Sequence, residues 1–295
     1  LQTRRLPGNG AGPQEDRLVI GSEGVFGVIT EAWLRLQDIP RCRAGCTLKF
    51  ESFAAGAAAC RALAQSGLLP SNARLVERDE ALFMGAGDGT HHMLVLGFES
   101  PALPQEQKLQ AALEICRAHG GKPGRLVVRN DDAAQAADES ADQWKQSFLR
   151  APYLRDELAR MGYISETFET CTTWANFPAL DAAVRAAVTQ AMQAQCGDGL
   201  ITCRFTHLYP DGPAPYYTVI APGAPGRQLL QWDAIKDAVS RALVEHGATI
   251  THHHAVGKDH RPYYLQQNAA LSLEMLRAAR QRLDPNGIMN PGTLL

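Results

Sequence analysis

The sequence has 295 residues, of which 45% are apolar and 20% charged, a balance typical of a soluble globular protein. No apolar run approaches the ~20 residues that a membrane-spanning helix needs. A net charge of −2 gives no reason to expect a nucleic-acid partner. The length predicts about two domains. The 7 cysteines have no paired framework and are typical of free thiols in a reducing compartment, so we expect a cytoplasmic protein.

The first half of the chain predicts alternating strands and helices. Residues 17–22 and 27–36 alternate apolar and polar side chains, which predicts two strands joined by a glycine-rich loop. The next segments predict a strand at 46–52 and a helix at 53–67. Two strands at 72–79 and 91–100 and a helix at 103–121 follow. An acidic, alanine-rich stretch, 129–142, then leads into a helical stretch at 143–150.

The second half repeats this alternation. It predicts a short helix at 151–163, a strand at 164–174 and a long helix at 177–197. A hairpin of two strands follows at 199–210 and 214–222, and two more helices are predicted at 229–247 and 271–283. Residues 248–257 run from a strand into a loop. Strand–helix–strand order recurs in 44–99 and 163–222. This recurrence favours an α+β fold, with an antiparallel sheet flanked by helices.

The glycine-rich loop has the sequence GSEGVFG, residues 21–27. It is not a P-loop, because no Gly-Lys-Ser/Thr follows, and it is not a Rossmann fingerprint, because a strand is predicted where a helix is required. Its spacing alone predicts a tight turn between strands. Glycines can also bring backbone N–H groups close to a ligand, and Ser22 adds a hydroxyl.

Three consecutive histidines, His252, His253 and His254, are a candidate catalytic cluster, a packing or surface cluster, or a metal site. If the strand continues through them, neighbouring side chains point to opposite faces and the three rings cannot converge on one ion. No cysteine or carboxylate stands nearby at metal-ligand spacing, so we expect no metal. Lys258 follows in a loop and is either solvated or available to an anionic group.

Tyr216 and Tyr217 are neighbours in a predicted strand. Because strand neighbours alternate, we expect one ring to face the core and the other a cavity. Either tyrosine can also be a packing residue.

Several motifs together resemble one enzyme family. The stretch 21–40, GSEGVFGVITEAWLRLQDIP, resembles the FAD-binding domain of the vanillyl-alcohol oxidase family of FAD-linked oxidases. Residues 283–295, LDPNGIMNPGTLL, resemble the closing D-P-x-x-I-x-N-P-G segment of that family. ATITHHHAVGKDHRPYY, together with SNARLVERD, YLRDELARMGY and ITCRFTHLYPDGPAPYY, resembles the alkylglycerone-phosphate synthase branch. The likeness extends over almost the whole chain.

The resemblance implies an α+β architecture in three segments. Residues 1–40 would be the C-terminal part of a PCMH-type FAD-binding domain, 41–250 a cap domain that binds substrate, and 251–295 a segment that packs back on the FAD domain. The family's pyrophosphate-binding loop, of the form P-x-G-G-x-T, is not in this sequence, and the chain begins with Leu1 instead of Met. We therefore expect a fragment of a longer protein, which binds FAD weakly by itself.

The resemblance also implies an activity. It is the exchange of a fatty alcohol for the acyl group of acyl-dihydroxyacetone phosphate at flavin N5, an ether-lipid reaction without net oxidation. One alternative is an FAD-linked oxidase or dehydrogenase of a hydroxy acid or alcohol, and another is a non-catalytic fragment. We expect a small anionic substrate, carrying a phosphate or carboxylate. A homodimer and a peripheral membrane contact stay open.

The resemblance assigns roles to particular residues. Those expected at the FAD are Gly21, Ser22, Glu23, Gly24, Gly27, Val28, Ile29, Arg74 and Asn290. Tyr216 would be the acid/base, and the other catalytic residues would be His252, His253, His254 and Arg155. The substrate would be held by Arg155, Lys258, Arg261 and Tyr217. Arginine suits a phosphate because its planar fork donates two parallel hydrogen bonds.

Overall fold

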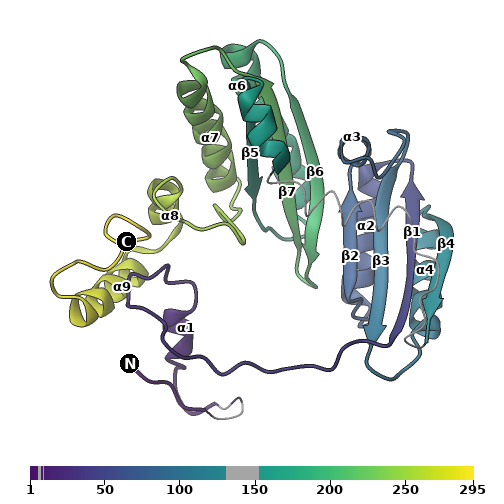
Figure 1. Cartoon of the computed structure of the whole chain (residues 1–295), viewed down its shortest axis with the longest axis horizontal. Coiled ribbons are helices and arrows are strands. Elements are labelled where there is room, and N and C mark those ends of the chain that lie inside the picture. Colours follow the sequence, from purple (N-terminus) through teal and green to yellow (C-terminus); the bar gives the residue numbers. More distant parts are fainter. Residues whose placement is uncertain (6–7, 9, 131–152) are drawn as a thin grey trace. The chain divides into compact units, whose positions relative to one another are not determined.

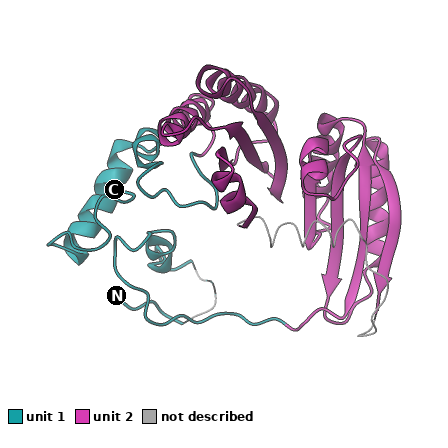
Figure 2. Ribbon diagram, turned by 45° about the horizontal axis from the view of Figure 1, so that its top comes forward, with its two compact units in different colours: residues 1–37, 250–295 teal, residues 38–249 magenta. Residues whose placement is uncertain are grey.

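The computed structural model, drawn in Figure 1, describes residues 1–5, 8, 10–130 and 153–295. These residues form two compact units, coloured separately in Figure 2. Unit 1 comprises residues 1–37 and 250–295, and unit 2 comprises residues 38–249.

Unit 2 is built on an antiparallel sheet with the strand order β4-β1-β3-β2-β6-β7-β5 (Figure 1). Its strands are β1 (Cys42–Phe50), β2 (Asn72–Val76), β3 (His92–Ser100), β4 (Lys122–Arg129), β5 (Tyr163–Glu169), β6 (Leu200–Leu208) and β7 (Pro213–Pro222). Its helices include α2 (Phe53–Gln65), α3 (Arg78–Phe83), α4 (Glu106–Ala118), α6 (Phe177–Cys196) and α7 (Gln228–Glu245). The predicted α+β fold with a helix-flanked antiparallel sheet is confirmed.

The sheet consists of two halves with the same chain order. In each half a strand, a helix and two further strands follow one another, as β1-α2-β2-β3 and as β5-α6-β6-β7. The halves meet edge to edge at β2 and β6, the second strand of each. Between these two strands, Val76 and Arg204 are the only register pair among the described residues. We call this line the β2–β6 seam. It leaves few backbone hydrogen bonds between the halves, so side chains must contribute to joining them.

One face of the sheet is covered by helices α2, α4, α6 and α7 (Figure 1). Alternate residues of β1 pack into this helix-covered face, and Phe205 of β6 joins the same core. Gly56 lets α2 approach β2 closely, since a Cβ there would lie 2.5 Å from Cδ1 of Leu75. We call the opposite face the open face. Helix α3 covers part of it, where Ala81 packs on Val76.

Unit 1 has a small core and a long exposed segment. Its helices are α1 (Asp16–Val19), α8 (Arg261–Gln267) and α9 (Ala270–Leu283). The buried members of its apolar core cluster are Val25, Val256, Leu273, Leu294 and Leu295.

The two strands predicted at 17–22 and 27–36 are not formed. The first is α1 followed by turns, and the second is chain without strand pairing, in which Val28 is 76% and Leu36 89% exposed. A strand requires a neighbour that takes its hydrogen bonds, and the described residues of unit 1 supply none to this segment.

Other predicted elements differ at their ends or in type. The strand predicted at 72–79 ends at Val76, and the helix α3 begins at Arg78. Neither α3 nor β4 nor α8 was predicted. The predicted helical stretch 143–150 lies outside the described residues, and 153–160 are helical as expected. Within the ranges that the structure describes, no helix combines the length and apolarity needed to cross a membrane.

Candidate functional site

The glycine-rich loop of unit 1 is held by Glu23. Its two carboxylate oxygens accept hydrogen bonds from the backbone N–H groups of Val256 (2.6 Å) and Gly257 (2.8 Å). The side-chain amide of Asn290 donates to the carbonyl oxygen of Glu23 at 2.5 Å. Glu23 and Asn290 were expected to contact the FAD. In the structure these polar groups join the loop to two C-terminal segments, and their contact with the FAD stays a prediction.

Two backbone N–H groups of this loop make no hydrogen bond to the described residues. Gly24 has φ +80°, a conformation that L side chains rarely adopt, and Gly21 and Gly27 also have positive φ. Among the described residues, no acceptor receives the N–H groups of Glu23 and Gly24. Val28 and Ile29 follow directly and are exposed. The loop can therefore offer two adjacent backbone donors and an apolar surface to a ligand.

The histidine cluster lies in bends, not in a strand. The rings of His252 and His253 stack with centroids 4.0 Å apart and planes at 29°. The carbonyl oxygen of His254 accepts a hydrogen bond from the Thr251 hydroxyl at 2.7 Å. The alternation that we expected to separate neighbouring rings does not apply here. That argument against a shared metal ion is therefore wrong, and the absence of a metal remains only a prediction.

Two further predicted residues lie near the start of α8. Lys258 is exposed, and its Cε lies 4.0 Å from the position that a Cβ on Gly292 would take. The Nε of Arg261 is buried and has no hydrogen-bond partner in the described chain. A buried donor without an acceptor is costly, which favours a ligand contact for this guanidinium. His260, which was not predicted, is buried beside it, with Nδ1 2.8 Å from the carbonyl oxygen of Ala255.

Tyr216 occupies the centre of a polar row on the open face of unit 2. The register of the sheet places Arg204 of β6 and Glu169 of β5 directly opposite Tyr216 of β7. The guanidinium carbon of Arg204 lies 3.7 Å from the centroid of the Tyr216 ring. The carboxylate of Glu169 is 3% exposed and accepts a hydrogen bond from the Thr206 hydroxyl. A cation, a phenol and a carboxylate thus lie side by side across three strands.

Arg74 belongs to the same face. Leu75 packs into the helix-covered core, so its neighbour Arg74 on β2 points to the open face, where it is half-buried. Burial lowers the pKa of Arg74, and the positive charge of Arg204 lowers it further. Arg204 therefore lies between two predicted residues, Arg74 and Tyr216. Neither Arg204 nor Glu169 was predicted, because their positions relative to Tyr216 depend on a register with a bulge between Phe205 and His207.

Tyr217 points to the opposite side of the sheet. Its hydroxyl donates to Oδ1 of Asp181 on α6 at 2.9 Å, and its ring stacks on Phe168 with centroids 4.9 Å apart. The side chain is completely buried, and this burial raises the pKa of Tyr217 well above its ordinary value. The substrate contact predicted for Tyr217 does not agree with this position, because the ring is enclosed between the sheet and α6.

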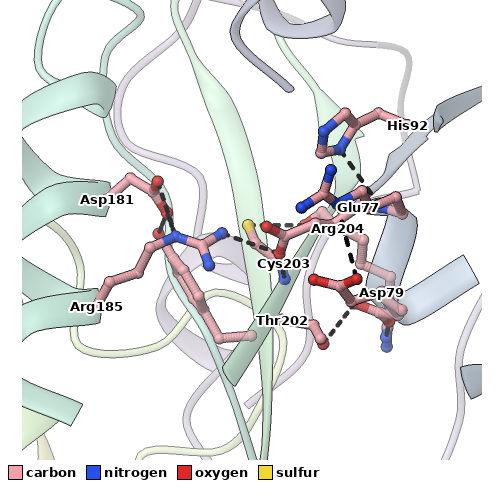
Figure 3. Close-up of polar contacts among 11 residues, drawn as sticks. Glu77, Asp79, His92, Asp181, Arg185, Thr202, Cys203 and Arg204 are labelled. Atoms are coloured by element: carbon pink, nitrogen blue, oxygen red, sulfur yellow. Dashed lines mark hydrogen bonds and ion pairs between the residues drawn. The ribbon is translucent and has the colours of Figure 1, made fainter. Parts of the chain in front are cut away.

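Two acid–arginine clusters lie on opposite sides of β6 at the β2–β6 seam (Figure 3). On the helix-covered side, Arg185 of α6 donates to Glu77 and to Asp181, each at 3.0 Å. Glu77 also accepts the backbone N–H of Cys203 at 2.7 Å. Burial raises the pKa of Glu77, although Arg185 opposes this shift.

On the open side, Arg204 pairs with Glu80 of α3, and both side chains are buried. Thr202 donates to the same carboxylate at 3.1 Å. The first cluster thus links Glu77, directly after β2, to β6. The second links α3 to β6.

Arg155 is exposed on the helical residues 153–160. None of the contacts in the described ranges joins it to Tyr216, so a role toward the substrate stays a prediction.

Known proteins match the chain over almost its whole length. A profile of the family described as FAD linked oxidases, C-terminal domain, matches residues 39–294. The chain is 25% identical to the alkyldihydroxyacetonephosphate synthase of Trypanosoma brucei brucei, over 94% of this chain and 48% of that protein. It is 26% identical to the synthase of Caenorhabditis elegans, over 99% and 52%. It is also 25% identical to a mitochondrial D-lactate dehydrogenase [cytochrome] of Arabidopsis thaliana, over 97% and 48%.

Solved structures share the fold. An alkyldihydroxyacetonephosphate synthase superimposes with a TM-score of 0.71 at 18% identity, covering 96% of this chain and 50% of that one. The 4-ethylphenol oxidase from Gulosibacter chungangensis has a TM-score of 0.57 at 13% identity, covering 88% and 54%. The chain thus spans about half the length of the relatives that it matches.

Proposed function

Because the chain belongs to the family of FAD-linked oxidases by its C-terminal domain, we propose that the whole protein is an FAD-dependent enzyme that uses Tyr216 for proton transfer. The observation that carries the proposal is the polar row on the open face. It sets Tyr216 between the buried cation Arg204 and the buried carboxylate Glu169 in a chain that matches a flavoenzyme family over residues 39–294.

The glycine-rich loop fits a flavin nucleotide. The free N–H groups of Glu23 and Gly24 are suited to oxygen atoms of the cofactor, and the exposed Val28 and Ile29 to its apolar parts. Glu23 fixes the loop through its hydrogen bonds with Val256 and Gly257. When bound, FAD supplies the electron-accepting ring, which no side chain can replace.

The substrate that this site suits is a small anion. Arg74 brings a positive charge to the open face beside the Arg204–Glu80 pair. In unit 1, Lys258 and Arg261 are separate candidates for binding an anion. In this proposal Tyr216 holds or releases the transferred proton at its hydroxyl oxygen, and Glu169 is the adjacent carboxylate that can take part in the same hydrogen-bond network.

Two reactions compete for this site. The first is the exchange of a fatty alcohol for the acyl group of acyl-dihydroxyacetone phosphate, supported by the similarity to two synthases of that class. The second is the oxidation of a 2-hydroxy acid, supported by the similarity to a D-lactate dehydrogenase. Both need an anion site and a group that moves a proton.

A comparison of the two reactions tests the proposal. The full-length protein is purified, its bound flavin is measured by absorption, and it is assayed for flavin reduction by D-lactate and for hexadecanol exchange on palmitoyl-dihydroxyacetone phosphate. We expect a flavin spectrum and exchange without net reduction. Reduction by D-lactate without exchange would favour the dehydrogenase. A full-length protein without flavin and without either reaction would contradict an enzymatic role.

A further inference from the structure

Arg204 is a buried cation with a fixed position. Its side chain is 7% exposed and pairs with the Glu80 carboxylate, which is 1% exposed. Thr202 donates to the second oxygen of that carboxylate at 3.1 Å, so both oxygens of Glu80 are bound. A guanidinium held in this way cannot leave its place without exposing an unpaired buried charge, which is strongly unfavourable.

The fixed guanidinium lies against the face of the Tyr216 ring, with 3.7 Å between its central carbon and the ring centroid. A planar cation over the face of an aromatic ring is attracted to it and restricts its rotation. We propose that Arg204 is a positioning residue that holds the Tyr216 ring on the open face, and that Glu80 acts on Tyr216 only through Arg204. The catalytic meaning of this inference rests on the proposed function, but the positioning itself does not.

The protein contains a matched control on the other side of the same strand. Arg185 also pairs with two partly buried carboxylates, Glu77 and Asp181 (Figure 3). Asp181 in turn accepts a hydrogen bond from Tyr217. Arg204 joins β6 to α3, and Arg185 joins α6 to Glu77, which follows β2 and accepts the N–H of Cys203 in β6. Of these two arginines, Arg204 contacts the Tyr216 ring, whereas Arg185 belongs to the network of Tyr217.

The experiment compares two double variants, Arg204→Met/Glu80→Gln and Arg185→Met/Glu77→Gln. Each double variant removes an arginine together with one acid that pairs with it. The acid is therefore not left as a carboxylate that has lost its cation. The 295-residue chain is labelled with ring-¹³C tyrosine, and the signals of the two residues are assigned with Tyr216→Phe and Tyr217→Phe. In the Arg204 variant we expect the Tyr216 ring signals to shift and its ring rotation to become faster, with Tyr217 unchanged. In the Arg185 variant we expect the reverse.

Turnover of the full-length, flavin-loaded protein gives the second measurement. We expect kcat to fall by about ten- to a hundredfold in the Arg204 variant, since displacement of a catalytic group by about 1 Å has effects of this size. Glu80→Gln alone should lower kcat less, and adding it to Arg204→Met should lower kcat no further. Arg204→Lys keeps the charge but not the planar group, so it should not restore the Tyr216 signals.

Unchanged Tyr216 signals in the Arg204 variant would overturn the inference, and so would equal changes of both tyrosines in both variants. The two proposals can fail separately. If Tyr216→Phe turns over normally while the Arg204 variant shifts Tyr216, the proposed function fails and the positioning holds. If Tyr216→Phe loses turnover while the Arg204 variant leaves Tyr216 unchanged, the positioning fails and the proposed function holds.

Discussion

The two units of the chain differ in how far they bury segments with alternating apolar residues. In unit 2, the alternating residues of β1 and β3 are buried on one face of the sheet and meet the helices in a continuous core. In unit 1, the segment 28–36 has a similar alternation, but its residues are exposed, with Trp33 at 67% and Leu36 at 89%. The same kind of sequence pattern thus gives a strand in one unit and an extended chain in the other.

The difference shows what an alternating pattern encodes. The pattern specifies which face of a strand is apolar, but the strand forms only when a neighbour takes its backbone hydrogen bonds. Unit 2 contains both partners of each strand pair in its described sheet. Unit 1 depends instead on side-chain links such as those of Glu23. Mutations can test whether the units really depend on such different interactions.

The largest effect is expected in the core of unit 2. Phe205 is fully buried, and its ring contacts those of Phe53, Trp174 and Phe177. Phe205→Ala should lower the free energy of unfolding of unit 2 by about 3–5 kcal/mol. Phe83→Ala, at a residue that is 40% exposed, should cost less than about 1 kcal/mol. Denaturant unfolding followed by hydrogen exchange measures both, and similar costs would refute this description of the core.

A smaller and local effect is expected in unit 1. Glu23→Ala removes the acceptor of two backbone N–H groups, which should cost about 2–3 kcal/mol. Hydrogen exchange at Val256 and Gly257 should become faster, while the sheet of unit 2 keeps its protection. Glu31→Ala, in the exposed segment, serves as the control and should change neither. If exchange at both amides stays slow in Glu23→Ala, a group other than Glu23 holds the loop.

The smallest effect concerns pH and lies again in unit 2. Burial lowers the pKa of His92, and the nearby charge of Arg78 lowers it further. Above the unfolded-state pKa of about 6.5 both states are neutral. As the pH falls below that value, the unfolded state binds a proton first, so unit 2 loses stability until the folded-state pKa is passed.

His92→Asn removes this titration and retains an acceptor for the Arg78 N–H, which lies 3.3 Å from Nδ1. The loss of stability between about pH 7.5 and about pH 5 should therefore be smaller in the variant than in the natural chain. Denaturant titrations at several pH values measure it. Parallel curves for the two proteins would show that His92 titrates alike in both states.

The sequence predicted the elements of unit 2 better than those of unit 1, for a physical reason. Strand and helix periodicity are local, so β6, β7, α6 and α7 were predicted with nearly correct ends, whereas β5 ends at Glu169 and not at the predicted residue 174. The segment 27–36 was predicted as a strand because its periodicity is equally clear, but periodicity does not report whether a partner is present. Helix α3 was missed because it is short and follows directly on β2.

The candidate site was predictable only in part. Tyr216 and Tyr217 could be assigned to opposite faces from their adjacency alone. The sequence does not show which of the two is buried. It also does not show that Arg204 and Glu169 lie in one row with Tyr216, because this row depends on pairing between strands that lie apart in the sequence. The stacking of His252 on His253 depends on bends that the predicted strand did not include.

The two tyrosines of β7 provide the most direct measurement of the central claim, that Tyr216 transfers a proton in a flavoenzyme. Tyr216→Phe and Tyr217→Phe are compared with the natural sequence in the full-length, flavin-loaded protein, for exchange and for flavin reduction. We expect Tyr216→Phe to lose about 10²- to 10⁴-fold in rate, as is usual when a general acid or base is removed. Tyr217→Phe should keep its rate and lose about 1 kcal/mol of stability with its hydrogen bond to Asp181. Small and equal losses of rate in both variants would contradict the claim.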